Sequence, residues 1–477
     1  MPRLRVEYAH YIQGEITVLK KLVGDRAFYR RLTAVMLPIL IQNVITNFVG
    51  LLDNIMVGQV GTEPMSGVAI VNQLLFVFNL SIFGGLAGAG IFTAQYHGKS
   101  DREGVRHTFR AKLYLSAALV LIAFAVFLTM GERLIELFLH EGEENLDLAA
   151  TLAYGRDYLR VMLWQIPLFA VMQVYGSTLR ETGETVLPMK AGVTAVIVNL
   201  VFNYILIFGK LGAPAMGVVG AAIATVISRV VECGIIVIWT HSHRDKAGFI
   251  EGAYSSGYVP MDLVRQITVR GLPLLVNEIL WATGMTMLNQ CYSTRGLEVV
   301  SAVNIATTVS NLFFCAFFAM GSTIAIMIGQ LLGAGELERA VDEDVKLIAF
   351  SVALSAAVGL VMAAIAPLVP EIYNTTAAVK TIACNLLIVS AVMMPMNAFT
   401  NSCFFTLRSG GKTAITFIFD SGFMWCIVVP LAFVLSRFTA MPILTLYICV
   451  HGLELIKCVM GYVMIKGRKW VNNLVAD

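Results

Sequence analysis

Charge is scarce in this sequence. Only 14% of its 477 residues are Asp, Glu, Lys or Arg, whereas 57% are hydrophobic. A soluble chain carries about 25% charged residues. The shortage of charge therefore argues against a soluble domain and indicates a chain that lipid surrounds over much of its length.

Motifs of catalysis and metal binding are missing as well. No cysteine occurs in the first 232 residues, and the eight that follow lack the spacing of a metal site. We interpret them as small buried apolar side chains. The sequence contains no aspartate-rich diphosphate motif, no His-Glu-x-x-His and no Gly-x-Ser-x-Gly. We therefore expect neither an enzyme nor a resident cofactor.

Long apolar runs are what the sequence does contain. A run of about 18 or more apolar residues is long enough to cross a bilayer. The runs are continuously apolar rather than alternating, which favours helices over the strands of a membrane barrel. We predict an all-α polytopic membrane protein whose twelve spans lie at 31–57, 66–94, 111–130, 157–179, 188–208, 214–240, 265–292, 299–330, 346–368, 381–407, 414–436 and 442–465.

The basic residues predict the orientation of these spans. Most of the 34 Lys and Arg residues fall in the set of loops that includes both ends of the chain, whereas the loop 131–156 on the other side is acidic. The positive-inside rule then places both termini in the cytoplasm. The net charge of +3 thus reflects membrane topology, and we expect no nucleic-acid partner.

The first residues are expected to remain on the mature protein. Residues 1–30 are polar and basic, and the first apolar run has no small-residue cleavage site, so no signal peptide is predicted. Apolar residues between positions 12 and 19 have helical spacing next to lysines. This stretch is either a helix on the inner membrane surface or a frayed tail.

The chain carries an internal duplication at two offsets, 228 and 235 residues. The matched residues are Pro167 with Pro395, Arg180 with Arg408, Gly183 with Gly411, Pro38 with Pro273, Gln95 with Gln330 and Gly98 with Gly333. Each half carries six spans, so the copies have the same orientation. This predicts two six-helix lobes related by a pseudo-two-fold axis along the membrane normal, with the functional cavity where the copies face each other.

The repeat also predicts the division of the chain. We expect an N-lobe at 31–240, a C-lobe at 265–465 and a cytoplasmic inter-lobe linker at 241–264. Residues 1–30 and 466–477 are expected to be cytoplasmic ends. A proline within a helix kinks it and frees a carbonyl group. The prolines matched between the halves are interpreted either as hinges or as parts of a static shape.

Ionisable residues inside the spans are few. Each costs about 2.5–3.5 kcal/mol at the centre of an inserted helix, so each is a candidate for function. Arg229 and Glu232 are three residues apart, and residues at this spacing share a helix face. Glu454 and Lys457 have the same spacing. We interpret both as local ion pairs, and Asp420 as an acid that reaches the inner interface.

Asp53 and Glu278 have no such local partner. Asp53 lies near the outer end of the first span, and Asn203 lies near the outer end of the fifth span, one turn beyond Asn199. We predict that these three residues share one depth. A carboxylate with amide oxygens suits a hard cation such as Na+, and the same carboxylate could instead take a proton. The alternative for Asp53 and Glu278 is a structural acid.

Three segments resemble one known family. Residues 51–58 (LLDNIMVG) are similar to the first-helix signature of the MATE family of multidrug and toxic compound extruders. Residues 179–185 (LRETGET), which follow Pro167, resemble the family's motif in the fourth span, and 407–413 resemble its second copy. The resemblance covers nearly the whole chain. Asn199 with Asn203 resembles the NorM-like branch.

The resemblance implies roles for the candidate residues. Asp53, Asn199 and Asn203 would form the cation site of the N-lobe, with Na+ as the metal ion, and Glu278 would be the acid of the C-lobe. Asn397 stands where related proteins usually carry an aspartate, so a C-lobe polar site would be weakened. Candidates for the substrate cavity are Gln42, Gln173, Asn277 and Trp281.

The implied function is secondary active efflux of organic, often cationic, amphipathic compounds by Na+ or H+ antiport through rocking alternating access. The protein would be a monomer in the plasma membrane of a prokaryote. The alternative is a lipid-linked saccharide or lipid flippase of the same architecture. Such a flippase needs several cationic residues in its cavity, and the spans offer only Arg229 and Lys457. A membrane-embedded enzyme and a passive channel are weaker alternatives.

Overall fold

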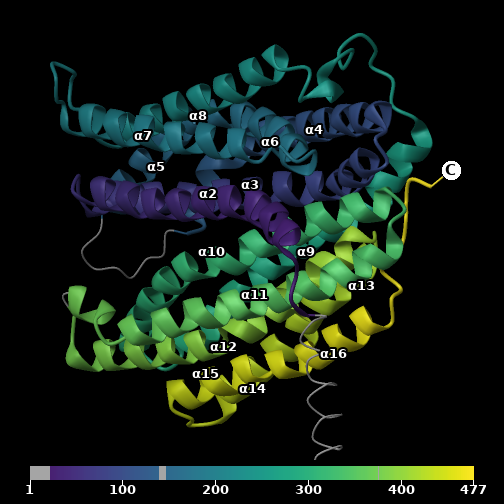
Figure 1. Cartoon of the computed structure of the whole chain (residues 1–477). Helices are drawn as coiled ribbons and strands as arrows, with labels where there is room; N and C mark the ends of the chain where they lie inside the picture. The colour runs from purple at the N-terminus through teal and green to yellow at the C-terminus, as the bar shows by residue number, and fades with distance from the viewer. Residues whose placement is uncertain (1–21, 139–146, 374, 477) are drawn as a thin grey trace, which may run out of the picture. The chain divides into compact units, whose positions relative to one another are not determined.

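The computed structural model describes residues 22–138, 147–373 and 375–476, and within these ranges the chain is helical without strands (Figure 1). The predicted surface helix near residues 12–19 lies outside them. The helices are α2 (Arg26–Gly58), α3 (Thr62–Gly98), α4 (Arg102–Glu136), α5 (Leu148–Met162), α6 (Gln165–Glu181), α7 (Val186–Phe208), α8 (Gly217–Ser242), η1 (Gly248–Ile250), α9 (Met261–Ser293), α10 (Leu297–Gly333), α11 (Leu337–Ile365), η2 (Val369–Ile372), α12 (Ala377–Ser409), α13 (Thr413–Phe417), η3 (Ile418–Gly422), η4 (Met424–Val428), α14 (Val429–Phe438), α15 (Ile443–Gly452) and α16 (Glu454–Lys466).

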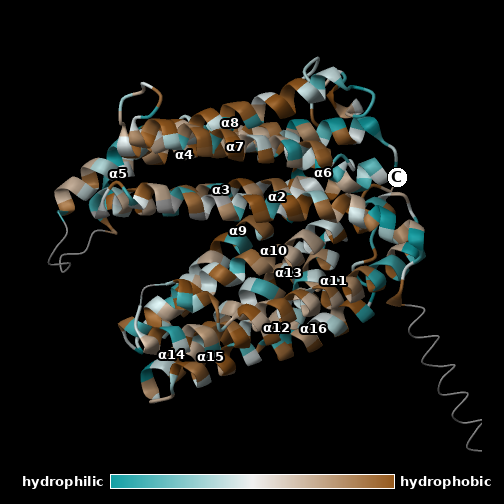
Figure 2. Ribbon diagram, turned by 60° about the vertical axis from the view of Figure 1, so that its left-hand side comes forward, coloured by the Kyte–Doolittle hydropathy of each residue, from teal (hydrophilic) through white to brown (hydrophobic). Residues whose placement is uncertain are grey.

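The helices confirm the predicted class of membrane protein. Among the described residues, eleven helical segments are long and apolar enough to cross a membrane. The remaining predicted span, 157–179, is formed by α5 and α6 in succession. Figure 2 shows hydrophobic residues along the long helices and hydrophilic residues gathered at helix ends and turns. This distribution is what a chain with many membrane spans requires.

Proline explains why the fourth span is broken. Pro167 is the third residue of α6, and α5 ends at Met162. A proline ring clashes with the carbonyl four residues earlier and removes one hydrogen bond, so a continuous helix through Leu163 is disfavoured. Its repeat counterpart, Pro395, lies inside the unbroken α12. The two copies therefore accommodate the same residue in different ways.

The eleventh span accommodates Pro430 through π-helical turns. Between α13 and α14 the chain forms two π-helical turns, η3 and η4, and Pro430 follows them as the second residue of α14. A π-turn pairs each N–H with the carbonyl five residues earlier. It occurs as a local bulge where the regular α-helical ladder is interrupted.

The described chain divides into two compact units. Unit 1 comprises the described residues within 1–40, 98–100 and 280–477, and unit 2 comprises those within 41–97 and 101–279. The boundaries fall inside two helices, so the first part of α2 belongs to unit 1 and the first part of α9 belongs to unit 2. Pro38 and Pro273 lie shortly before these two boundaries. The predicted lobes, in contrast, begin and end within a few residues of helix ends.

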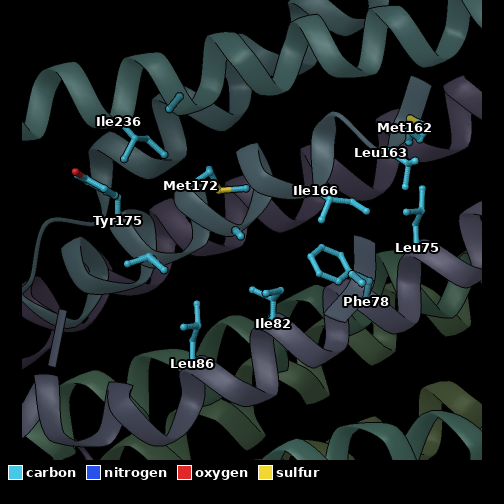
Figure 3. Close-up of a cluster of buried hydrophobic side chains, with 14 of the residues drawn as sticks. Leu75, Phe78, Ile82, Leu86, Met162, Leu163, Ile166, Met172, Tyr175 and Ile236 are labelled. Atoms are coloured by element: carbon cyan, nitrogen blue, oxygen red, sulfur yellow. The ribbon is translucent and has the colours of Figure 1, made fainter. Parts of the chain in front are cut away.

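Unit 2 is built around a core shared by α3, α5, α6 and α8. Leu75, Phe78, Ile82 and Leu86 follow one another at helical spacing along α3, and Figure 3 shows them beside Ile166 of α6. These side chains are almost completely buried. Apolar residues three or four apart form one stripe of a helix, and the stripe packs against its neighbours. α7 packs along α8 in the same unit.

Unit 1 is organised around α12. This helix packs against α10, α11 and α16, and its buried residues Leu386 and Met394 belong to the core of the unit. The end of the chain also packs here. Trp470 is 1% exposed, and Nζ of Lys99 donates to the carbonyl of Val475 over 2.8 Å. The predicted cytoplasmic tail is thus folded onto unit 1 as far as the structure describes it.

The predicted inter-lobe linker packs against α4 in unit 2. Arg110 of α4 is 6% exposed and donates to three carbonyls of the 241–264 segment. The acceptors are Gly252 at 2.6 Å, Ala253 at 2.7 Å and Tyr258 at 3.0 Å. Guanidinium groups carry five N–H donors in a fixed fork, which suits several carbonyls at once. Arg110 therefore fixes the path of the segment.

Replacing Arg110 with Met is expected to loosen this segment. The change leaves up to three carbonyls without their donor, and we expect the free energy of unfolding to fall by about 2–4 kcal/mol. A lower thermal-unfolding midpoint in detergent and faster proteolysis within 241–264 would be measured. The matched control is Arg244→Met, which removes an exposed arginine bonded only to a carbonyl at 3.3 Å. Equal effects of the two substitutions would contradict the prediction.

Candidate functional site

The aspartate and the two asparagines predicted at one depth meet in unit 2. Asn203 of α7 donates from Nδ2 to Oδ1 of Asp53 on α2 over 2.6 Å. Asn203 is 1% exposed, and Asn199, one turn earlier on the same helix, is 5% exposed. The two amides are buried, whereas Asp53 is half-buried and obtains a hydrogen bond from the protein. The structure thus brings the three residues together.

The amide of Asn199 connects Asp53 with α8. With its nitrogen turned toward the carboxylate, that nitrogen lies 2.8 Å from Oδ1 and 3.1 Å from Oδ2 of Asp53. In the opposite orientation the nitrogen donates to Oγ1 of Thr225 over 3.3 Å, and the amide oxygen accepts from Asn203 over 3.1 Å. A half-turn of an amide exchanges donor and acceptor. Asn199 can therefore present either N–H or oxygen at the carboxylate.

One buried oxygen of this site has no hydrogen-bond partner. It is Oδ1 of Asn203. A buried acceptor without a donor is costly, and a bound cation would satisfy it. Together with the Asp53 carboxylate and the amide oxygen of Asn199, it makes a set of hard oxygen donors of the kind that Na+ takes. The donor set fits a monovalent cation that neutralises one negative charge.

The site does not resemble a transition-metal centre. Within the described part of the chain, no group of three or more His, Cys, Asp or Glu side chains is arranged to hold a metal ion. Transition metals prefer imidazole and thiolate ligands, whereas this site offers one carboxylate and two amides.

Neutral residues around Asp53 were not predicted from the sequence. Thr225 contacts Asn199, and Tyr158 of α5 is 4% exposed and close enough to interact electrostatically with Asp53. The hydroxyl of Tyr158 donates to Oδ1 of Asn72 over 3.3 Å. Neutral polar side chains in a span carry no large insertion cost. The high insertion cost that made Asp53 a candidate is therefore absent for these residues.

A buried ion pair lies in the same unit. Nη1 of Arg229 donates to Oε2 of Glu232 over 2.6 Å, which confirms the predicted local pair. A Cβ added to Gly192 of α7 would lie 3.1 Å from Nε2 of Gln42 and 3.5 Å from Oε1 of Glu232. Gln42, a predicted cavity residue, and Glu232 of the ion pair therefore both lie beside this glycine.

The other predicted residues are distributed over both units. Asn277 and Glu278 of α9 belong to unit 2, and Asn277 is 2% exposed. A Cβ on Gly84 of α3 would lie 3.0 Å from Cγ of Glu278, so Glu278 packs against α3. The sequence assigned Glu278 to the C-lobe, whereas its packing groups it with unit 2. Gln173 is half-buried in unit 2, and Trp281 is half-buried in unit 1.

Unit 1 has its own polar cluster. Asn397 is half-buried on α12, and its carbonyl accepts from Oγ1 of Thr400 over 3.2 Å. Thr400 also donates to Oε1 of Glu454 over 2.5 Å. The prediction that Lys457 pairs with Glu454 is wrong, because Nζ of Lys457 lies 2.8 Å from Oδ1 of Asp420 on η3. A lysine reaches a neighbouring helix, and local spacing does not reveal that partner.

Two buried charges near helix ends were also missed. Lys112 of α4 is fully buried, forms an ion pair with Glu181 and donates to Thr178 over 3.2 Å. Asp344 of α11 is fully buried and accepts from Thr406 over 2.6 Å. Asp344 lies in a segment predicted to be a cytoplasmic loop, and Lys112 is the second residue of the predicted span 111–130. Thr178 and Thr406 correspond at the 228 offset, so the same hydroxyl faces a cation in one copy and an anion in the other.

Comparison with known proteins extends over both halves of the chain. The family model described as MatE matches residues 38–205 and 273–434. The probable multidrug resistance protein NorM of Thermotoga maritima is 24% identical over 94% of this chain and 94% of its own length. The multidrug resistance protein MdtK of Edwardsiella ictaluri is 25% identical over 76% of this chain and 78% of its own.

A solved structure has the same fold. It is an outward-facing conformation of a multidrug resistance MATE family transporter of the MOP superfamily. The TM-score is 0.84 at 21% identity, and the alignment covers 94% of this chain and 97% of that chain. At this identity the likeness establishes the helical architecture, and the chemistry has to be argued from the residues.

Replacing Asn203 with Ala is expected to weaken cation binding. The change removes one oxygen ligand of the cation and the hydrogen bond to Asp53. We expect the free energy of cation binding to weaken by about 1.4 kcal/mol, which is tenfold in affinity. A ligand that binds only the folded protein raises its thermal-unfolding midpoint. The measurement is the NaCl or proton concentration at which this rise is half complete. Asn304→Ala, at an exposed asparagine of α10, is the control, and an equal shift there would refute the assignment.

Proposed function

Because the chain belongs to the MatE family, we propose that it is a secondary active multidrug efflux transporter. It exports organic, often cationic, amphipathic compounds and takes up Na+ or H+ in exchange. The observation that carries the coupling is the part-buried contact of 2.6 Å between Asp53 and Asn203, with Asn199 beside them. Relatives named as multidrug resistance proteins, which cover most of this chain, support the substrate class.

The coupling ion acts at the Asp53 carboxylate. In the described arrangement amide N–H groups face this carboxylate. A Na+ ion would be held by the carboxylate and by amide oxygens after Asn199 and Asn203 turn, whereas a proton would neutralise the carboxylate directly. Either event removes a negative charge from a place with little water. The helix that carries Asp53 then packs against α7 through different contacts.

The position of Asp53 on α2 gives this local change a wider effect. Residues 26–40 of α2 belong to unit 1 and residues 41–58 to unit 2, so one continuous helix enters both packing units. A change in the packing of α2 at Asp53 therefore also affects the packing of residues 26–40 of the same helix. Such a change drives alternating access by rocking only if the cation binds the two states with different affinity.

The setting of the transporter is proposed from the sequence. The positive-inside rule favours cytoplasmic termini in the plasma membrane of a prokaryote, which fits the bacterial relatives. We propose that the protein works as a monomer, with N-lobe, C-lobe and linker as predicted. Gln42, Gln173, Asn277 and Trp281 remain the candidates for substrate contact. No chemical reaction is part of the proposal, so it describes a transporter and no enzyme.

The flippase alternative is disfavoured by the ion pairs that Arg229 and Lys457 form. A flippase for lipid diphosphates needs free cationic side chains. Arg229 lies 2.6 Å from Glu232, and Lys457 lies 2.8 Å from Asp420. Each guanidinium or ammonium group is thus already neutralised by a carboxylate, which leaves little positive charge for a diphosphate.

The coupling is tested with Asp53→Asn in proteoliposomes. The amide keeps the shape of the side chain but removes the charge that a cation neutralises. We expect the initial rate of Na+- or H+-driven efflux of a fluorescent organic cation to fall at least about tenfold. Glu278→Gln is compared in the same assay, and retained transport in that variant would confine coupling to Asp53.

The control is Asn304→Ala, which should transport as the unchanged protein does. If efflux in Asp53→Asn follows the imposed gradient at the original rate, the coupling mechanism is wrong. Absence of gradient-driven efflux of any organic cation by the unchanged protein would favour the flippase.

A further inference from the structure

One face of α8 carries three polar residues beside the Asp53 site. Thr225, Arg229 and Glu232 are four and three residues apart and therefore lie on one side of the helix. Thr225 contacts Asn199, and Glu232 lies beside Gly192 of α7, as Gln42 does. Arg229 lies between these two contacts along the helix. It is one turn from Thr225, whose hydroxyl contacts Asn199 of the Asp53 site.

The surroundings of Arg229 leave part of its guanidinium unused. Its Nη1 donates to Glu232, and its plane lies 5.7 Å from the ring centre of Phe169. Its Nε is buried and has no hydrogen-bond partner. The side chain of Glu232 is 3% exposed, and its carboxylate is paired with Arg229. An arginine with spare donors between two carboxylates can favour either of them.

The duplicated half lacks this arrangement. Lys457 corresponds to Arg229 at the 228 offset, but Met460 stands in place of Glu232 and Lys457 pairs with an acid on another helix. At the 235 offset Leu288 stands in place of Asp53. The second copy has thus kept a cation without either acid. The combination of Asp53, Arg229 and Glu232 is therefore not part of the scaffold that the halves share.

We propose that Arg229 and Glu232 set how tightly the Asp53 site holds its coupling cation. Arg229 opposes the incoming cation by placing a positive charge near the Asp53 carboxylate, and Glu232 favours the cation by holding and neutralising that charge. The inference rests on the proposed role of Asp53 as the coupling site. It adds a reason why the cation can leave again, which an antiporter requires in every cycle.

The charges that act on Asp53 can be named for each neighbouring helix. From α8 the charged group is Arg229, with Glu232 bonded to it, and from α5 the titratable group is Tyr158. The groups contributed by α7 are the neutral amides of Asn199 and Asn203. Among these groups Arg229 carries the positive charge, one turn from Thr225 on the same face of α8.

Opposite shifts in cation affinity distinguish this role from a structural one. Removing either partner of a purely structural ion pair leaves the other charge buried and uncompensated, so both changes destabilise the protein. In the proposed role, Arg229→Gln lowers the cation concentration for half-maximal effect by about tenfold, and Glu232→Gln raises it by about tenfold. Arg229→Lys keeps the charge and should stay near the unchanged protein.

The experiment uses the purified full-length protein in detergent. The rise of its thermal-unfolding midpoint is followed against NaCl at a fixed alkaline pH, and against pH without Na+, so that the two cations are tested separately. The concentration at half effect is compared rather than the midpoint itself, because a substitution can change the baseline stability. Efflux at varied cation concentration in proteoliposomes gives the second readout, and its half-saturation should move in the same direction.

The variants also separate this inference from the proposed function. If Asp53→Asn still responds to the cation as the unchanged protein does, the site assignment fails. If Asp53→Asn loses the response while Arg229→Gln and Glu232→Gln move the half-effect concentration in the same direction or leave it unchanged, this inference is overturned. Lys457→Gln is the matched control in the second copy and should leave the half-effect concentration unshifted. Glu232→Asp, which keeps the charge, replaces Glu232→Gln should the latter not fold.

Discussion

A charge inside a lipid-surrounded helix is tolerated only where a neighbouring group neutralises or solvates it, and this constraint determines where the described helices meet. Lys112 and Glu181 connect α4 with α6. Asp53 and Asn203 connect α2 with α7. Apolar packing alone discriminates poorly between neighbours, because lipid is as apolar as the helix surface. The polar contacts therefore fix which helix faces which, and the same contacts supply the groups that a coupling ion needs.

The sequence predicted well those features that depend on one segment at a time. Apolar length gave the spans, and helical spacing gave the pair of Arg229 and Glu232. It predicted poorly what depends on a second segment. The partner of Lys457 is an acid on another helix, and Asp344 is buried although its own segment is polar enough for a loop. The break before Pro167 shows the same limit, since its counterpart leaves a helix intact.

The repeat shows how packing positions can be kept after duplication while the ionisable groups diverge. Matched residues such as Thr178 and Thr406 keep their places in the packing, while the charge that each contacts has changed sign. Hydroxyl groups allow this because they donate as well as accept. The scaffold can thus stay constant while the ionisable groups of each copy evolve separately. The proposed cation site in one copy needs no counterpart in the other.

The division of α2 and α9 between the units has a consequence for biosynthesis. Unit 2 includes residues 261–279, which are translated only after the whole N-terminal half and the 241–264 segment. When the N-terminal half enters the membrane, it consequently lacks the packing of residues 261–279. Residues 26–40 reach their neighbours in unit 1 only when the second half has been synthesised. Domains usually fold in the order of synthesis. Here neither unit can be completed until the ribosome has passed into the second copy, so a gene divided at the repeat boundary would yield two fragments that need each other to fold.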